Sequence, residues 1–250
     1  MSATPTSDDA ASPSFRMRGL ETTRLDTFVD AAFALGTTVL LVAKGQLPTN
    51  YEEFVLLLLD APAFFLSFGV MMIFWLSHRS WSRHYGLENN ITIALSLLLV
   101  FCLLIYVYPL KLMFGALVNV STGGAIPTVM EVGRVTEVTS LIAIYAVGFT
   151  TLSATILLLY IESLRRREEL ALTPLEVYET RSGVYIWLVM VVVGVIAAVL
   201  AKALPPRAAV FSGFAYWLLA VLIPAVSVVR QRRSEKLFGV SVPVSADAPA

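Results

Sequence analysis

Charged residues are scarce in this sequence. They make up 14% of its 250 residues, against roughly 25% in a typical soluble domain. The net charge at pH 7 is zero, so the chain lacks the broad positive field that binding to nucleic acid requires. Hydrophobic residues reach 57%, which is more than a chain of this length can hide from water. The composition therefore predicts a membrane protein with no nucleic-acid partner.

Residues that carry enzyme chemistry are also few. Cys102 is the one cysteine, which excludes an internal disulfide. The two histidines, His78 and His84, lack the helical pairing of a zinc site. The sequence contains no recognisable Gly-rich phosphate loop, Ser-His-Asp set or carbonyl-lined potassium filter. We therefore predict no enzymatic activity, no metal site and no cofactor.

Long hydrophobic runs are abundant instead. A membrane-spanning helix needs about 20 mostly apolar residues. Six segments meet or approach this length, so we predict an all-α integral membrane protein with six spans in a transmembrane domain at 21–236. The predicted spans are 28–43, 54–76, 91–112, 141–161, 184–204 and 208–229. Residues 1–20 and 237–250 are mostly small and polar, and we expect them to be disordered tails.

The basic residues are unevenly distributed between the two ends of the predicted spans. Thirteen of the 18 lysines and arginines lie on one side, and five lie on the other. Connections rich in basic residues stay in the cytoplasm. We therefore predict that both termini are cytoplasmic and that the protein lies in the inner (plasma) membrane.

Two carboxylates lie inside predicted spans. Asp30 is in the first span and Asp60 is in the second, and a carboxylate at mid-bilayer costs roughly 2.5–3.5 kcal/mol. Asp26 or Asp30 could simply cap a helix near the headgroups, or Asp30 could join a network between helices. Trp75 and His78 are three residues apart and share a helix face. They could belong to that network or to an interfacial aromatic belt.

The two polar motifs resemble those of a known family. Arg24, Phe28 and Asp30 match the first-helix signature of the transmembrane protein 175 family, Arg-x-x-x-Phe-Ser-Asp followed by an apolar helix. The family's second helix ends in Trp-x-x-His, as Trp75 to His78 do here. The motifs stand in the family's order, about 45 residues apart. Beyond about residue 83, the resemblance is one of topology and hydropathy.

The resemblance implies a potassium-permeable cation channel of the bacterial type. It implies a homotetramer whose first helices line a central pore, with K⁺ and other monovalent cations as permeant ions and membrane lipid around it. We expect the motif residues to hold the start of the first helix against its neighbours. Val29 replaces the family's serine, so this network lacks one hydroxyl. The expected network residues are Arg24, Phe28, Asp30, Trp75 and His78.

A stripe on the first helix fits the implied pore. Ala31, Leu35, Thr38 and Val42 advance by three or four residues and share one face. Around a fourfold axis these side chains become stacked rings, with Leu35 as the narrowest. The alternative is that the stripe packs against another helix, with Thr38 bonded to its own backbone at Ala34.

Two other functional classes remain open from the sequence. A proton-coupled secondary transporter could use Asp30 or Asp60 as a relay. A membrane scaffold could bind anionic lipid or a partner through the basic cluster Arg165–Arg167.

Overall fold

The computed structural model describes residues 15–42, 49–126 and 135–239, and these residues form helices and connections without a strand. The described elements are α1 (Arg24–Val42), α2 (Tyr51–Leu59), α3 (Ala61–Tyr85), α4 (Asn90–Ser121), α5 (Val135–Arg165), α6 (Pro174–Ala203), α7 (Pro206–Ala209), the 3₁₀ helix η1 (Val210–Tyr216) and α8 (Trp217–Phe238).

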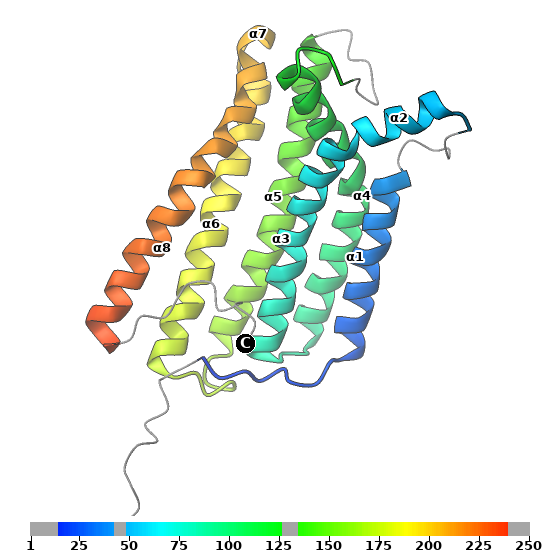
Figure 1. Cartoon of the computed structure of the whole chain (residues 1–250). Coiled ribbons are helices and arrows are strands. Elements are labelled where there is room, and N and C mark those ends of the chain that lie inside the picture. The colour runs from blue at the N-terminus through cyan, green and yellow to red at the C-terminus, as the bar shows by residue number, and fades with distance from the viewer. Residues whose placement is uncertain (1–14, 43–48, 127–134, 240–250) are drawn as a thin grey trace, which may run out of the picture.

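The predicted all-α architecture with six spans is confirmed. Among the described residues, six helical segments are long and apolar enough to cross a membrane. They run side by side in one bundle, with α1 and α8 at opposite edges (Figure 1). We use the term motif end for the end of the bundle at which α1 begins. The helices α3, α5 and α8 finish at this same end.

Local sequence determines where several spans begin and end. Asn89 and Thr92 form a reciprocal capping box at the start of α4, and Thr173 and Glu176 form another at the start of α6. Gly86 closes α3 in the left-handed conformation at φ 55°, which glycine adopts without a Cβ penalty. The chain therefore reverses tightly at the motif end.

The predicted second span, 54–76, is wrong in its position. One helix finishes at Leu59, and the membrane-spanning helix is Ala61–Tyr85. Pro62 lies in the first turn of α3, and its ring and missing N–H prevent α2 from continuing. The interruption that the sequence placed inside a span is thus the boundary between two helices.

The short helix α2 projects sideways from the bundle at the end opposite the motif end (Figure 1). Asn50 caps it by accepting a hydrogen bond from the backbone N–H of Glu53. Hydrogen bonds from the backbone and side chain of Thr49 keep the pKa of Glu53 below its ordinary value. None of the residues of α2 is buried within the subunit.

Parts of both predicted tails lie within the described residues. Residues 15–20 pack along the motif end, where Arg18 forms an ion pair with Glu176. Leu237 and Phe238 are the last residues of α8, which Gly239 caps. The rest of both tails, 1–14 and 240–250, lies outside the described residues.

The apolar core lies between α1, α3, α4 and α5. Phe33, Met71, Leu103 and Ile156 come from these four helices and are almost fully buried. At Gly148, a Cβ would collide with the ring of Tyr106 on α4. Glycine therefore permits the close approach of α4 and α5 at this level.

Candidate pore helix and its contacts

The predicted pore-lining residues lie on the exposed face of α1. Ala31, Leu35, Thr38 and Val42 are all exposed within the subunit, with Leu35 at 55% and Val42 at 48% of full exposure. The Thr38 hydroxyl donates a hydrogen bond to the Ala34 carbonyl at 3.2 Å. The stripe is thus not covered by any described helix of its own subunit.

The opposite face of α1 is packed against α3 and α4. Val29, Phe33, Gly36 and Leu40 are buried there. Val29, which replaces the serine of the family signature, is 0% exposed and belongs to the apolar core. A hydroxyl at this position would need a partner inside the core, and valine removes that requirement.

Asp30 and Trp75 meet at the motif end. The Trp75 indole N–H donates to Asp30 Oδ1 at 2.8 Å, and the Arg79 guanidinium lies 5.2 Å from the centre of the Trp75 ring. The indole therefore joins α1 to α3 and also accepts a cation–π contact. This is the one pair of the predicted network that the structure joins directly by a hydrogen bond within the described residues.

The other predicted network residues have different surroundings. His78 is buried and hydrogen-bonds to Ser96 of α4 at 2.9 Å, so it links α3 to α4. Arg24 and Phe28 are exposed, and among the described residues no hydrogen bond or ion pair joins Arg24 to Asp30 or His78. No feature of the sequence marked Ser96 as the histidine's partner.

Asp26, and not Asp30, takes part in the cap of the first helix, where the Thr23 hydroxyl accepts a hydrogen bond from the Asp26 backbone N–H at 3.1 Å. Its Oδ2 accepts hydrogen bonds from the backbone N–H and the hydroxyl of Thr23, and Oδ1 accepts one from Ser82 at 2.6 Å. The capping alternative drawn from the sequence therefore applies to Asp26. The bond to Ser82 also fixes this cap to α3.

A pocket of about 280 Å³ opens beside these contacts at the motif end. Its walls carry both signs of charge, so it is not a purely acidic cation trap. The lining residues are Gly19, Leu20, Glu21, Thr22, Asp26, Asp30, His78, Arg79, Ser82 and Arg83.

A segment before α1, residues 15–22, crosses the motif end beneath the bundle (Figure 1), and we call it the strap. The Arg18 guanidinium donates hydrogen bonds of 3.0 and 2.9 Å to the two carboxylate oxygens of Glu176 on α6, which is nearly fully buried. It also donates one to the Leu170 carbonyl. Gly19 lies so close to α3 that a Cβ would collide with the Ser82 carbonyl oxygen. The strap therefore ties the start of α1 to both α3 and α6.

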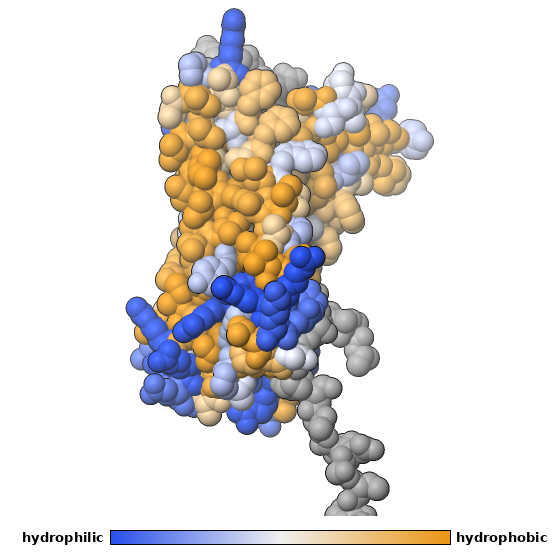
Figure 2. All heavy atoms as spheres, turned by 90° about the vertical axis from the view of Figure 1, so that its left-hand side faces the viewer, coloured by the Kyte–Doolittle hydropathy of each residue, from blue (hydrophilic) through white to orange (hydrophobic). Residues whose placement is uncertain are grey.

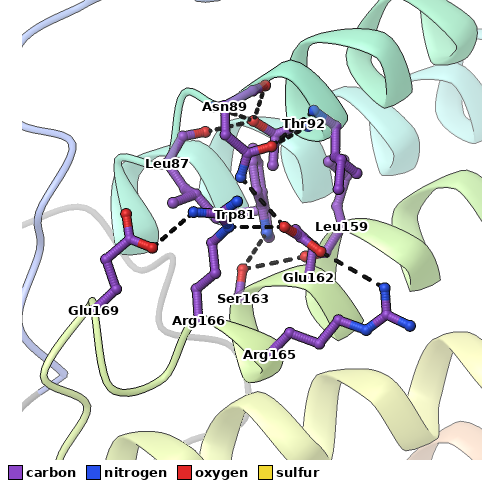
Figure 3. Close-up of polar contacts among 11 residues, drawn as sticks. Trp81, Leu87, Asn89, Thr92, Leu159, Glu162, Ser163, Arg165, Arg166 and Glu169 are labelled. Atoms are coloured by element: carbon purple, nitrogen blue, oxygen red, sulfur yellow. Dashed lines mark hydrogen bonds and ion pairs between the residues drawn. The ribbon is translucent and has the colours of Figure 1, made fainter.

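A second polar cluster at the motif end joins α3, α4 and α5 (Figure 3). The buried Glu162 carboxylate accepts hydrogen bonds from Arg166 at 2.8 Å and Asn89 at 3.4 Å. The Trp81 indole donates to Ser163 at 2.9 Å. Because these groups are satisfied, the motif ends of three spans are held in one arrangement.

At the opposite end, a buried ion pair secures α1. Lys111 Nζ of α4 lies 3.0 Å from Asp60 Oδ2 and donates to the Leu40 carbonyl at 2.8 Å. That carbonyl belongs to the last described turn of α1. The lysine side chain is 3% exposed and the aspartate 6%. The sequence did contain a signal, because both charges lie inside predicted spans.

The geometry defines a class of protein: a multi-pass helical membrane protein with six spans, one of which leaves a partly polar face uncovered at the edge of the bundle. Comparison with known proteins narrows this class. The sequence model of the family described as endosomal/lysosomal potassium channel TMEM175 matches residues 24–108.

Two relatives match most of the chain. A protein of Marivirga tractuosa named "Potassium channel" is 29% identical over 236 residues, which cover 90% of this chain and 94% of that protein. The crystal structure of a threonine-to-alanine variant of the potassium channel MtTMEM175, in complex with a nanobody–MBP fusion, is 28% identical with a TM-score of 0.76. It covers 90% of this chain and 98% of that one. The predicted resemblance to the TMEM175 family of potassium channels is confirmed by these matches.

Proposed function

We propose that this protein is a potassium-permeable cation channel in which four copies surround a central pore lined by α1. Both relatives bear the name potassium channel. The uneven distribution of basic residues supports an inner-membrane orientation with the motif end, and hence both termini, in the cytoplasm.

The uncovered face of α1 carries this proposal. Arg24, Thr27 and Thr38 share it with Leu35 and Val42, so one exposed stripe carries both polar and apolar side chains. Lipid solvates arginine and hydroxyl groups poorly. A partner subunit or a water-filled path suits this mixture better than the hydrocarbon core does.

The exposed face of α4 provides a contrast. Its exposed side chains are large and apolar over most of the span, as expected for contact with lipid tails. They include Ile91, Leu97, Leu98, Phe101 and Ile105. The two helices thus favour different surroundings, lipid for α4 and the assembly axis for α1.

Within the proposed pore, Leu35 forms the constriction. Four leucine side chains at one level exclude water, so an ion must shed part of its hydration shell to pass. Thr38 lies about one turn further along. Its hydroxyl hydrogen is used by the Ala34 carbonyl, which leaves the oxygen lone pairs free to face a partly dehydrated cation. Potassium loses water more readily than sodium, so this arrangement favours potassium.

The alternative of a proton relay finds less support. Asp60 is held by Lys111 in a buried ion pair, and Asp30 accepts a hydrogen bond from Trp75. Both carboxylates therefore have structural partners that a relay would have to break.

The test is the reversal potential of the purified protein in planar bilayers between potassium and sodium solutions. Leu35→Ala should raise basal current and weaken potassium preference, because it widens and wets the constriction. Thr38→Ala should weaken the preference and leave basal current low. Leu98→Ala, on the exposed face of α4, and Thr151→Ala, whose hydroxyl makes the same intrahelical bond, are the matched controls.

Two results would contradict the proposal. If neither α1 variant shifts the reversal potential, α1 does not line the selective part of the pore. If both variants only reduce assembly, the stripe is a packing seam. Saturable proton-coupled uptake without discrete conductance steps would instead favour the transporter.

A further inference from the structure

An arginine is held rigidly between α6 and α8 near the motif end. Arg230 Nε donates to Ser182 Oγ, and Nη2 donates to the Tyr178 carbonyl, both at 2.8 Å. Its guanidinium lies 4.0 Å from the centre of the Tyr178 ring and 5.0 Å from that of Tyr185. A guanidinium has five N–H groups, so the remaining ones are available to a ligand.

The charge of Arg230 is not balanced by a bonded carboxylate. Among the described residues, no ion pair within 4.0 Å joins Arg181, Arg230 or Arg233 to an acidic side chain. Glu179 is near enough to experience the charge of Arg230, but no hydrogen bond connects them. Arg181 is exposed one residue before Ser182, and Arg233 is exposed one turn beyond Arg230. Both helices therefore contribute positive charge to this surface, which we call the arginine patch (Arg181, Arg230 and Arg233).

The helices α6 and α8, which carry the arginine patch, lie on the side of the bundle away from α1 (Figure 1). The helix α8 packs only against α6 and η1 among the described elements, and Ser234 is its one buried residue. If α1 faces the pore axis, α8 faces the surrounding lipid. This step depends on the proposed assembly, whereas the arginine patch itself does not.

The surface above the arginine patch is apolar. Figure 2 shows this face with a broad hydrophobic band and with hydrophilic side chains gathered below it, toward the motif end. Exposed apolar residues continue upward from the patch on both helices, including Leu188 and Val192 on α6 and Val221 and Val229 on α8. A positively charged patch below an apolar surface matches the two parts of a phospholipid, with its phosphate at one end and its acyl chains at the other.

We propose that Arg230 and Arg181 form a binding site for the phosphate of an anionic phospholipid in the leaflet at the motif end. Arginine suits this ligand because its planar fork pairs with phosphate oxygens. The contacts to Tyr178 and Ser182 hold Arg230 in place before the lipid arrives, which reduces the ordering cost of binding. The acyl chains lie along the apolar faces of α6 and α8.

The experiment titrates purified protein in detergent with dioleoylphosphatidylglycerol and follows the melting temperature, with dioleoylphosphatidylcholine as the zwitterionic control. Stabilisation by ligand gives the half-saturating concentration. We expect the anionic lipid to stabilise the wild-type protein more than phosphatidylcholine. Arg230→Gln should raise its half-saturating concentration about tenfold, since charge-assisted hydrogen bonds are lost. Arg181→Gln should raise it about fivefold.

Arg207→Gln is the matched control, because this exposed arginine lies at the other end of the same helical segment. It should leave the titration unchanged. Arg181 makes no bond within the described residues, so Arg181→Gln tests the site even if Arg230→Gln fails to fold. Equal stabilisation by both lipids would overturn the proposal, and so would wild-type titrations for both Arg230→Gln and Arg181→Gln. Dissociation of the oligomer with unchanged lipid binding would make this face a subunit contact and would also overturn it. Because no ion flux is measured, failure here is distinguishable from failure of the proposed channel function.

Discussion

Replacing Lys111 by methionine would leave the Asp60 carboxylate buried without its counter-charge. In the structure, the ammonium lies 3.0 Å from Asp60 and 2.8 Å from the Leu40 carbonyl. Removing one partner of a buried ion pair typically costs about 3–5 kcal/mol. The lost bond to Leu40 adds about 1–3 kcal/mol, since a buried acceptor loses its donor. We therefore expect Lys111→Met to destabilise the protein by roughly 4 kcal/mol or more.

The double variant isolates the ion pair from the other effects of substitution. Asp60 makes no side-chain capping bond in α3, so Asp60→Asn removes the charge and little else. Lys111→Met combined with Asp60→Asn should recover about 1–3 kcal/mol relative to Lys111→Met alone, because no buried charge remains. The assay is thermal unfolding of the purified oligomer, where about 4 kcal/mol corresponds to roughly 8–16 °C in a chain of this size.

An exposed lysine supplies the control. Lys202 lies near the end of α6 and is exposed, so Lys202→Met should change stability by no more than about 0.5 kcal/mol. Equal melting temperatures for Lys111→Met and Lys202→Met would refute the reasoning. A double variant less stable than Lys111→Met would show that Asp60 is not stabilised by the lysine charge.

Three further substitutions test contacts between the helices in the same unfolding assay. Arg18→Ala should destabilise the protein by about 2–3 kcal/mol, because the nearly fully buried Glu176 loses two charge-assisted hydrogen bonds. Arg167→Ala, at an exposed arginine, is the control and should be near neutral. Equal effects of the two variants would contradict a strap anchored by the Arg18–Glu176 ion pair. Trp75→Phe should cost about 1 kcal/mol by removing the donor to Asp30, and an unchanged melting temperature would mean that this bond does not stabilise α1. Gly148→Ala should cost about 1–3 kcal/mol, since the new methyl group collides with the Tyr106 ring, and tolerance would show that α4 and α5 can separate there.

Local sequence alone determined the number of spans and which residues of α1 share one face of the helix. Hydrophobic length and the helical period are properties of neighbouring residues. For that reason the six spans were predictable, and Ala31, Leu35, Thr38 and Val42 fall together on one exposed face. Helix ends were less predictable, because polar residues such as those at the end of α8 extend a span beyond its apolar part.

Only the tertiary structure decided which polar groups meet. Asp60 and Lys111 pair across two spans, His78 bonds to Ser96 and not to Asp30, and the strap joins Arg18 to a carboxylate 158 residues away. Each of these charges and hydroxyls was visible in the sequence, and burial required that each find a partner. The choice of partner depends on how the helices rotate and slide against one another in packing. That arrangement is set by contacts such as Gly148 with Tyr106, which no local pattern encodes.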